Sequence, residues 1–159
     1  MPKHRETRTL PYSPEQMFDL VADVERYPEF LPWVVGARVD RRADSNAFQA
    51  DLLVGFKMIR ERYTSQVELD RPNRIDVTYT RGPFRYLENH WQFEPHPEGC
   101  RIDFYLDFEF RSRLLQRIMG SLFHEAVKKM VSAFEARARR LYGDQHGNAT
   151  GALPSERPA

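Results

Sequence analysis

Between Trp33 and Arg111, hydrophobic and polar residues alternate with a period of two in six successive stretches. This period places neighbouring side chains on opposite faces of a strand, so each stretch predicts a β-strand with one covered and one solvent-facing side. Turn-forming segments such as Arg71-Pro72-Asn73 separate the stretches and predict an antiparallel meander. The six predicted strands cover approximately residues 33–40, 48–56, 59–69, 75–80, 86–93 and 101–111.

Residues 3–10 precede the meander and fit a further short strand. Ser13, Pro14 and Gln16 then form the pattern of a helix start. A serine caps the helix, a proline occupies its first turn, and a glutamine three residues on returns to the capping residue. This pattern predicts a helix that runs to about Asp23, followed by a short helical turn.

From about Ser112 to Leu141, apolar residues recur every three or four positions, which predicts one long amphipathic helix. About thirty residues at a rise of 1.5 Å make a helix about 45 Å long, enough to cross a sheet of six or seven strands. The element order predicts an α+β helix-grip fold, in which a curved antiparallel six- to seven-stranded sheet surrounds a long C-terminal helix. We expect a single domain over residues 1–142 and a disordered tail over residues 143–159.

The segment 21–33, called the joint below, leads from the first helix into the meander. Pro28 and Pro32 each disfavour helical geometry at the preceding residue, so the chain is expected to bend there. Tyr27, Phe30 and Trp33 are too apolar to be left on a solvent-exposed loop without a purpose. The joint is therefore expected to cover a large apolar interior, which favours a container over a catalyst.

Composition excludes several classes of function. The 24 basic and 23 acidic residues give a net charge of +1, which favours neither a nucleic-acid-binding protein nor an enzyme for acidic substrates. A single cysteine, Cys100, cannot form an intramolecular disulfide or a cysteine-based zinc site. The histidines lack metal-ligand spacing, and no nucleotide-binding or nucleophile motif occurs, so we expect no enzyme. Without a long apolar run or a signal-peptide pattern, the default expectation is a cytoplasmic protein.

Two of the alternating rows carry polar residues on the side expected to be covered. Glu61 and Ser65 share a face with Tyr63 on one strand, and Asn89 lies on the covered side of another. A buried carboxylate without a partner costs several kcal/mol, so Glu61 needs a hydrogen bond, a cation, water or a ligand. Either these groups orient the polar head of a mostly apolar ligand, or Glu61 pairs with an arginine or faces solvent and Asn89 bridges backbone groups.

Basic residues cluster in the last turns of the long helix. Two interpretations stay open for them. The charges interact favourably with the helix dipole and aid solubility, or they form a docking patch for anionic lipid headgroups or ribosomal RNA. The cluster consists of Lys128, Lys129, Arg137, Arg139 and Arg140.

Three blocks of the sequence resemble the coenzyme Q-binding START-like family. The joint is similar to the signature of that family, and residues 53–57 and 82–84 open a second and a third block. Together the blocks cover most of residues 3–142 in order. The second block continues with Glu61, Tyr63, Thr64, Ser65 and Val67, and the third with Leu87, Asn89, Trp91 and Phe93.

This resemblance implies the helix-grip fold shared by START, Bet v 1 and polyketide cyclase-like domains. It also implies binding of ubiquinone or a related polyprenyl lipid in support of respiratory electron transport, without a required cofactor. The bacterial branch is similar to the ribosome association toxin, so action on ribosomal subunits is the alternative, and a cyclase-type enzyme using Glu61 is a third. Peripheral contact with the inner membrane or the ribosome would use Lys128, Lys129, Arg137 and Arg140.

We expect the ring of a quinone to lie near Glu61, Tyr63 and Asn89, with the tail along the aromatic and aliphatic residues around the long helix. No catalytic or metal-binding residue is predicted. The predicted ligand-binding residues are Phe18, Tyr27, Phe30, Leu31, Trp33, Val35, Phe56, Glu61, Tyr63, Tyr79, Leu87, Asn89, Trp91, Phe104, Leu106, Leu115, Met119 and Phe123.

Overall fold

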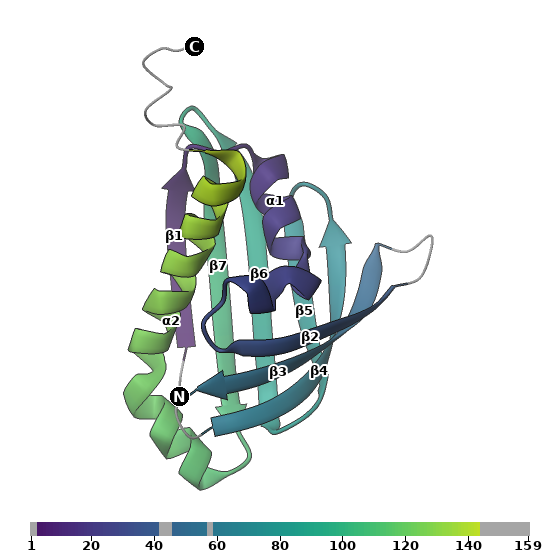
Figure 1. Ribbon diagram of the computed structural model, residues 1–159, viewed down its shortest axis with the longest axis vertical. Helices are drawn as coiled ribbons and strands as arrows, with labels where there is room; N and C mark the ends of the chain where they lie inside the picture. Colours follow the sequence, from purple (N-terminus) through teal and green to yellow (C-terminus); the bar gives the residue numbers. More distant parts are fainter. Residues whose placement is uncertain (1–2, 42–45, 57–58, 144–159) are drawn as a thin grey trace.

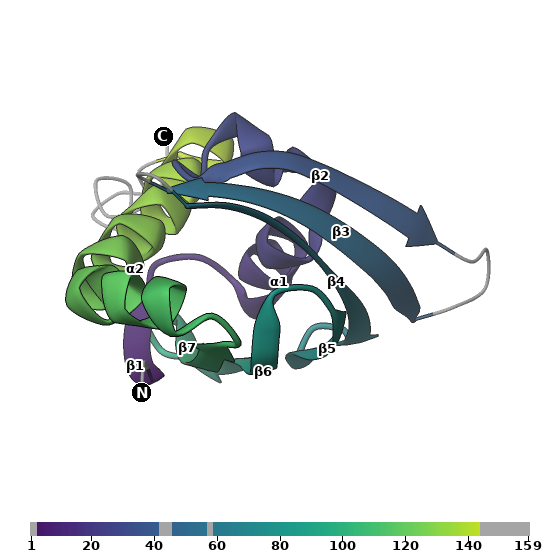
Figure 2. The same cartoon turned by 90° about the horizontal axis from the view of Figure 1, so that it is seen from below.

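A computed structural model of the protein describes residues 3–41, 46–56 and 59–143. Seven antiparallel strands form one sheet in the order β1-β7-β6-β5-β4-β3-β2, and its two edges curl towards each other (Figures 1 and 2). The elements are β1 (Lys3–Leu10), α1 (Pro14–Ala22), the 3₁₀ helix η1 (Val24–Glu29), β2 (Val34–Arg41), β3 (Ala47–Phe56), β4 (Ile59–Asp70), β5 (Arg74–Arg81), β6 (Phe84–His96), β7 (Gly99–Phe110) and α2 (Arg113–Tyr142).

The predicted helix-grip architecture is confirmed. The thirty-residue α2 runs along the concave side of the sheet, while α1 and η1 cover the rest of that side (Figures 1 and 2). The predicted domain boundary at residue 142 stays a prediction, because the expected tail falls almost wholly outside the described residues.

Both helices begin where the sequence predicts. The Gln16 backbone N–H donates to Ser13 Oγ at 3.0 Å, and the Ser13 N–H donates to Gln16 Oε1 at 2.9 Å, which is the reciprocal capping box. Ser112 Oγ accepts from the Leu115 N–H at 3.2 Å and caps α2 in the same manner. Local hydrogen bonding therefore fixes both helix starts, independently of the sheet.

A β-bulge near the start of β2 overturns one sequence expectation. The pairing with β3 shifts register between Val34 and Gly36, so β2 has one additional residue there. Val34 is consequently buried, whereas Val35 is 46% exposed. Strict alternation from Trp33 placed Val35 on the covered side; that prediction is wrong because the bulge reverses the face on which this valine lies.

The hydrophobic core divides into two clusters along α2. The larger lies between α1, the joint, the C-terminal half of α2 and the middle of the sheet, and includes Phe18, Phe93 and Phe134. The smaller lies under the N-terminal half of α2 and includes Phe84, Phe108 and Phe123. A helix that packs on two separate clusters bridges whatever space lies between them.

The C-terminal half of α2 is held by polar contacts as well as by packing. The Tyr142 hydroxyl donates to the backbone oxygen of Gln16 at 2.9 Å. Arg8 of β1 pairs with Glu135 at 2.6 Å, and Arg137 pairs with Glu29 of η1 at 2.9 Å. These contacts attach α2 to α1, β1 and the joint, so this end of the helix is the firmly anchored one.

Two glycines give opposite expectations for substitution by alanine. Gly99 has φ +138°, and a Cβ there would lie 2.3 Å from the Leu10 backbone oxygen, so Gly99→Ala should destabilise the protein by about 2 kcal/mol or more. Gly120 lies within α2 with no atom within 4 Å of an added Cβ, so Gly120→Ala should stabilise by about 0.5–1 kcal/mol. Denaturant unfolding of both variants checks the signs. A neutral Gly99→Ala would show that the β6–β7 turn is not pressed against the strand end at Leu10.

Candidate functional site

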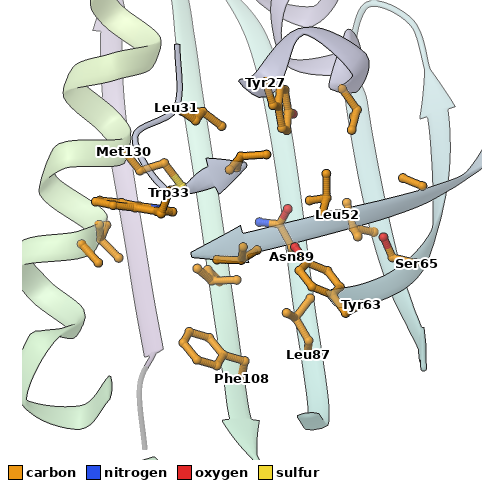
Figure 3. A pocket seen from close by; sticks show the side chains of 18 of the residues that line it. Tyr27, Leu31, Trp33, Leu52, Tyr63, Ser65, Leu87, Asn89, Phe108 and Met130 are labelled. Carbon is orange, nitrogen blue, oxygen red and sulfur yellow. The ribbon is translucent and has the colours of Figure 1, made fainter. Parts of the chain in front are cut away.

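A cavity of about 210 Å³ lies between the inner side of α2, the concave face of the sheet and the joint (Figure 3). Almost all of its wall is aliphatic or aromatic. The residues that line it are Val21, Val24, Tyr27, Leu31, Trp33, Val34, Ala50, Leu52, Val54, Tyr63, Ser65, Val67, Ile75, Val77, Phe84, Leu87, Asn89, Trp91, Phe104, Leu106, Phe108, Phe110, Met119, Phe123, Ala126, Val127, Met130 and Phe134.

The joint forms one end of the cavity because aromatic packing fixes it against α2. The Tyr27 and Phe30 rings meet Phe134 edge to face at centroid distances of 5.7 and 5.4 Å. The Tyr27 hydroxyl donates to the backbone oxygen of Val21, and the Leu31 N–H donates to the Tyr27 backbone oxygen at 2.9 Å. This local network turns the chain so that Leu31 points towards the cavity (Figure 3).

Asn89 lies on the cavity wall with its side chain already engaged. Its Nδ2 donates to the Tyr105 backbone oxygen at 3.0 Å, and its Oδ1 accepts from Trp91 Nε1 at 3.2 Å. Asn89 therefore joins one backbone group to a side chain and does not bridge two backbone groups as one interpretation expected. Asn89 also fixes the orientation of the Trp91 indole, which lines the cavity beside it. One amide N–H and a carbonyl lone pair remain for a ligand.

Tyr63 and Ser65 bring hydroxyl groups to the same wall from β4 (Figure 3). Within the described part of the chain, neither hydroxyl has a hydrogen-bond partner. Burial raises the pKa of Tyr63 to about 12, because the phenolate would lie in apolar surroundings. The Tyr63 ring packs edge to face on Phe84 at 5.3 Å. Two neutral donors are thus held in an otherwise apolar space, where a ligand acceptor would satisfy them.

Gly82, in the turn between β5 and β6, approaches Tyr63 from outside the cavity. Its φ is +145°, and a Cβ at this position would lie 2.6 Å from the Cβ of Tyr63. The turn therefore lies close behind the tyrosine. Any larger residue at position 82 would force Tyr63 to move.

Glu61 does not belong to the cavity wall. It is half-buried near the start of β4, opposite Val54 of β3, and Val54 rather than Glu61 reaches the cavity. Among the described residues of the wall Glu61 is not included, so its role in orienting a ligand head group stays a prediction. Its parity along the strand was correct, but on β4 the described wall of the cavity begins at Tyr63, two residues further along.

The structure brings together only part of the predicted ligand-binding set. Phe18 packs on Phe93 at 5.8 Å within the core, and Tyr79 accepts a hydrogen bond from the Phe84 N–H at 3.0 Å. Leu115 packs against the smaller core cluster, and the Phe56 side chain lies outside the described residues. Phe30, within the joint, packs on Phe134 of α2, and Val35 faces outward. The predicted residues that line the cavity are Tyr27, Leu31, Trp33, Tyr63, Leu87, Asn89, Trp91, Phe104, Leu106, Met119 and Phe123, and their contact with a ligand stays a prediction.

Sequence reasoning missed much of the wall, although the pattern held the signal. Ala50, Leu52 and Val54 alternate on β3 with a period of two, and Val127 and Met130 continue the apolar stripe of α2. The alternation identifies covered residues but not how far each lies from α2. That depth depends on sheet curvature, which the pattern alone does not give.

The site has the chemistry of a binding cavity for an apolar molecule. Among the described residues, no group of three or more His, Cys, Asp or Glu side chains could hold a metal ion. Within the same residues, no helix is long and apolar enough to cross a membrane.

The basic cluster near the end of α2 is not uniform. Arg137 is only 11% exposed, pairs with Glu29 and lies 5.0 Å above the Phe30 ring. The hydrogen bond from Arg137 lowers the pKa of Glu29, because it favours the carboxylate. The predicted docking role is therefore wrong for Arg137, which stabilises the joint. Lys128 and Arg140 are exposed.

The sequence profile of a family described as polyketide cyclase / dehydrase and lipid transport matches residues 10–135. The chain belongs to this family. Its START-like architecture agrees with the solution structure of an 18 kDa protein from Caulobacter crescentus, which is 38% identical with a TM-score of 0.75 and covers 91% of this chain and 100% of that one. A START superfamily protein from Mycobacterium smegmatis, at 22% identity and a TM-score of 0.74, shares the fold over 87% of this chain and 98% of its own.

Relatives within the family carry two kinds of name. The chain is 38% identical over 143 residues to the ribosome association toxin RatA of Escherichia coli strain K12, covering 89% of this chain and 90% of the toxin. It is 37% identical over 148 residues to the coenzyme Q-binding protein COQ10 homolog B, mitochondrial, of Xenopus laevis, covering 90% of this chain but only 60% of that protein. Because the chain is about equally identical to both relatives, sequence identity does not distinguish between the two names.

The raised pKa of Tyr63 predicts a specific dependence of stability on pH. The folded state holds the phenol proton more tightly than the unfolded chain does, whose tyrosine pKa is 10.0. This contribution to the free energy of unfolding is complete below pH 10 and should be lost as the pH rises from 10 to about 12. Tyr63→Phe should reduce that loss, as measured by chemical denaturation across the range. An ordinary titration of Tyr63 in difference absorbance spectra would contradict its burial.

Proposed function

We propose that the protein binds a polyprenyl quinone of the ubiquinone class in the cavity, without chemical conversion. The observation that carries the proposal is an apolar cavity with two hydroxyl donors, Tyr63 and Ser65, that lack partners among the described residues. A quinone ring presents carbonyl oxygens, which accept such hydrogen bonds, and its hydrocarbon tail suits the rest of the wall. The name of the Xenopus laevis relative supports this ligand class.

The size of the cavity defines how the ligand would fit. A volume of about 210 Å³ is below the roughly 300–1,000 Å³ of pockets for drug-sized ligands. It suits a ring-sized head group and not a complete polyprenyl tail. The tail therefore needs a path out of the cavity. The space between the start of β2 and α2 is the proposed path, and Trp33 and Met130 face each other there (Figure 3). Each methylene that stays buried contributes about 0.8 kcal/mol.

The tryptophans offer a direct measurement of binding. Both tryptophans of the chain, Trp33 and Trp91, line the cavity, so a bound quinone should quench nearly all of the protein's tryptophan fluorescence. Titration with a short-chain ubiquinone analogue should give saturable quenching. Val77→Phe and Leu106→Phe fill the cavity and should weaken binding at least about tenfold, equivalent to about 1.4 kcal/mol. Both residues line the wall.

Val35→Phe is the matched control, because Val35 lies on the outer side of β2 and gains the same atoms away from the cavity. Thermal unfolding should show that all three variants fold. If the quinone quenches the tryptophan fluorescence of Val77→Phe and Leu106→Phe with the same affinity as that of the wild type, the proposed site is wrong.

Hydrogen bonding to the head group predicts ligand selectivity. Tyr63→Phe and Ser65→Ala each remove one donor and should weaken quinone binding about three- to tenfold, since a net hydrogen bond contributes about 0.5–1.5 kcal/mol. A simple alkyl compound has no acceptor, so its own affinity should be the same in these variants as in the wild type. The amount of alkyl compound needed to displace the quinone should therefore change only as far as the change in quinone affinity explains. Unchanged quinone affinity in both variants would remove the quinone from the proposal and leave a general apolar ligand.

Ribosome association is a second candidate function, and the RatA relatives favour it. Co-sedimentation of the protein with purified ribosomal subunits tests it directly. The cavity-filling substitution Val77→Phe separates the two candidates, because a surface-mediated association should survive it and quinone quenching should not. A cyclase-type reaction through Glu61 is not proposed, since Glu61 lies outside the wall.

A further inference from the structure

Helix α2 carries a net positive charge that the rest of the chain does not. This helix contains seven Lys or Arg and two Glu residues, a net charge of +5 in a chain whose total is +1. The remainder of the chain is therefore net negative, at −4. Both acidic residues of α2 are engaged, because Glu125 pairs with Lys129 at 3.4 Å and Glu135 with Arg8.

Four of these charges lie in one row, here called the basic stripe: Arg113, Arg117, Lys128 and Arg139. At 3.6 residues per turn they fall within an arc of about 80° and span about 40 Å of helix axis. All four are exposed, and none has an ion-pair partner among the described residues. No other described element covers this side of α2 (Figures 1 and 2).

One exposed leucine borders the basic stripe. Leu114 is 63% exposed, and on the helical wheel it lies about 20° beyond Arg139. Leu141, at the opposite end of α2, is 50% exposed. Together with Val35 they are the exposed large hydrophobic residues of the described chain. Leu141 lies about 80° from Arg113 on the side away from the rest of the stripe, so Leu114 alone borders the stripe. An exposed leucine beside a row of basic residues suits a surface that is anionic outside and apolar beneath.

The geometry points to docking of α2, through the basic stripe, on an anionic lipid bilayer. The basic stripe turns several unpaired charges to one side of α2, and each Lys or Arg near an anionic surface adds favourable binding energy. Single-stranded RNA is usually bound by exposed aromatic side chains that stack on bases. The aromatics of α2 do not serve this role, since Phe123 and Phe134 are buried and Tyr142 bonds to Gln16.

This docking would place the cavity next to the membrane. The inner side of α2 supplies Met119, Phe123 and Met130 to the wall, so the same helix contacts the cavity and the bilayer. An apolar ligand could then leave the bilayer beside α2 without crossing bulk water. The surface itself does not depend on which ligand the cavity takes.

Vesicle co-sedimentation tests the surface. The full chain should bind vesicles of phosphatidylcholine with phosphatidylglycerol, and not phosphatidylcholine alone. Combined Arg117→Glu, Lys128→Glu and Arg139→Glu should lower the partition coefficient at least about 100-fold. The matched control combines Arg60→Glu, Arg62→Glu and Arg81→Glu, which are exposed on β4 and β5 and change the charge equally. It should lose less than about threefold.

Further arms keep the outcomes separate. The corresponding triple Gln variant replaces the Glu variant if reversal of Arg139 unfolds the end of α2. Leu114→Ser should weaken vesicle binding at high salt, where the charges are screened. Quinone quenching should survive in the stripe variant, so its loss would count against the cavity and not against docking. No vesicle binding, equal loss in both triples, or a stripe that binds ribosomal RNA but no vesicle would each overturn the inference.

Discussion

The packing of α2 across the concave face of the sheet is the interaction on which the cavity depends. Phe134 anchors one end against Tyr27, Phe30 and Trp91, and Phe123 contacts Phe108 at 5.5 Å towards the other. Between these contacts the curved sheet and α2 are too far apart for their side chains to fill the space. Small residues on the sheet, such as Ala50 and Ser65, leave the remaining volume empty. The space is thus a result of curvature and anchoring at two points.

The few polar groups in the wall divide into two kinds. Asn89 has one donor and one acceptor contact within the protein, and these contacts hold Trp91 in place. Tyr63 and Ser65 have no such partners in the described part of the chain, and they define the side of the cavity that a polar head group would face. A ligand without acceptors would leave these hydroxyls buried and unsatisfied, which costs about 1–3 kcal/mol for each group.

Most of the fold could be predicted from the sequence, because alternation, capping and the helical stripe are local patterns. The site could be predicted only in part. Val34 and Val35 are both apolar, so the pattern could not show the bulge that decides which of them faces inward. Glu61 had the correct parity, yet its distance from the cavity depends on sheet curvature. Arg137 resembled its basic neighbours until Glu29, 108 residues earlier in the chain, proved to be its partner.

The close approach of Gly82 to Tyr63 links a surface turn to the interior. At position 82 the turn has no room for a side chain, because an added Cβ would lie 2.6 Å from the Cβ of Tyr63. A larger residue at position 82 would therefore shift Tyr63 without replacing any residue of the wall. For protein engineering, position 82 offers a way to move the Tyr63 side chain from a residue outside the cavity wall.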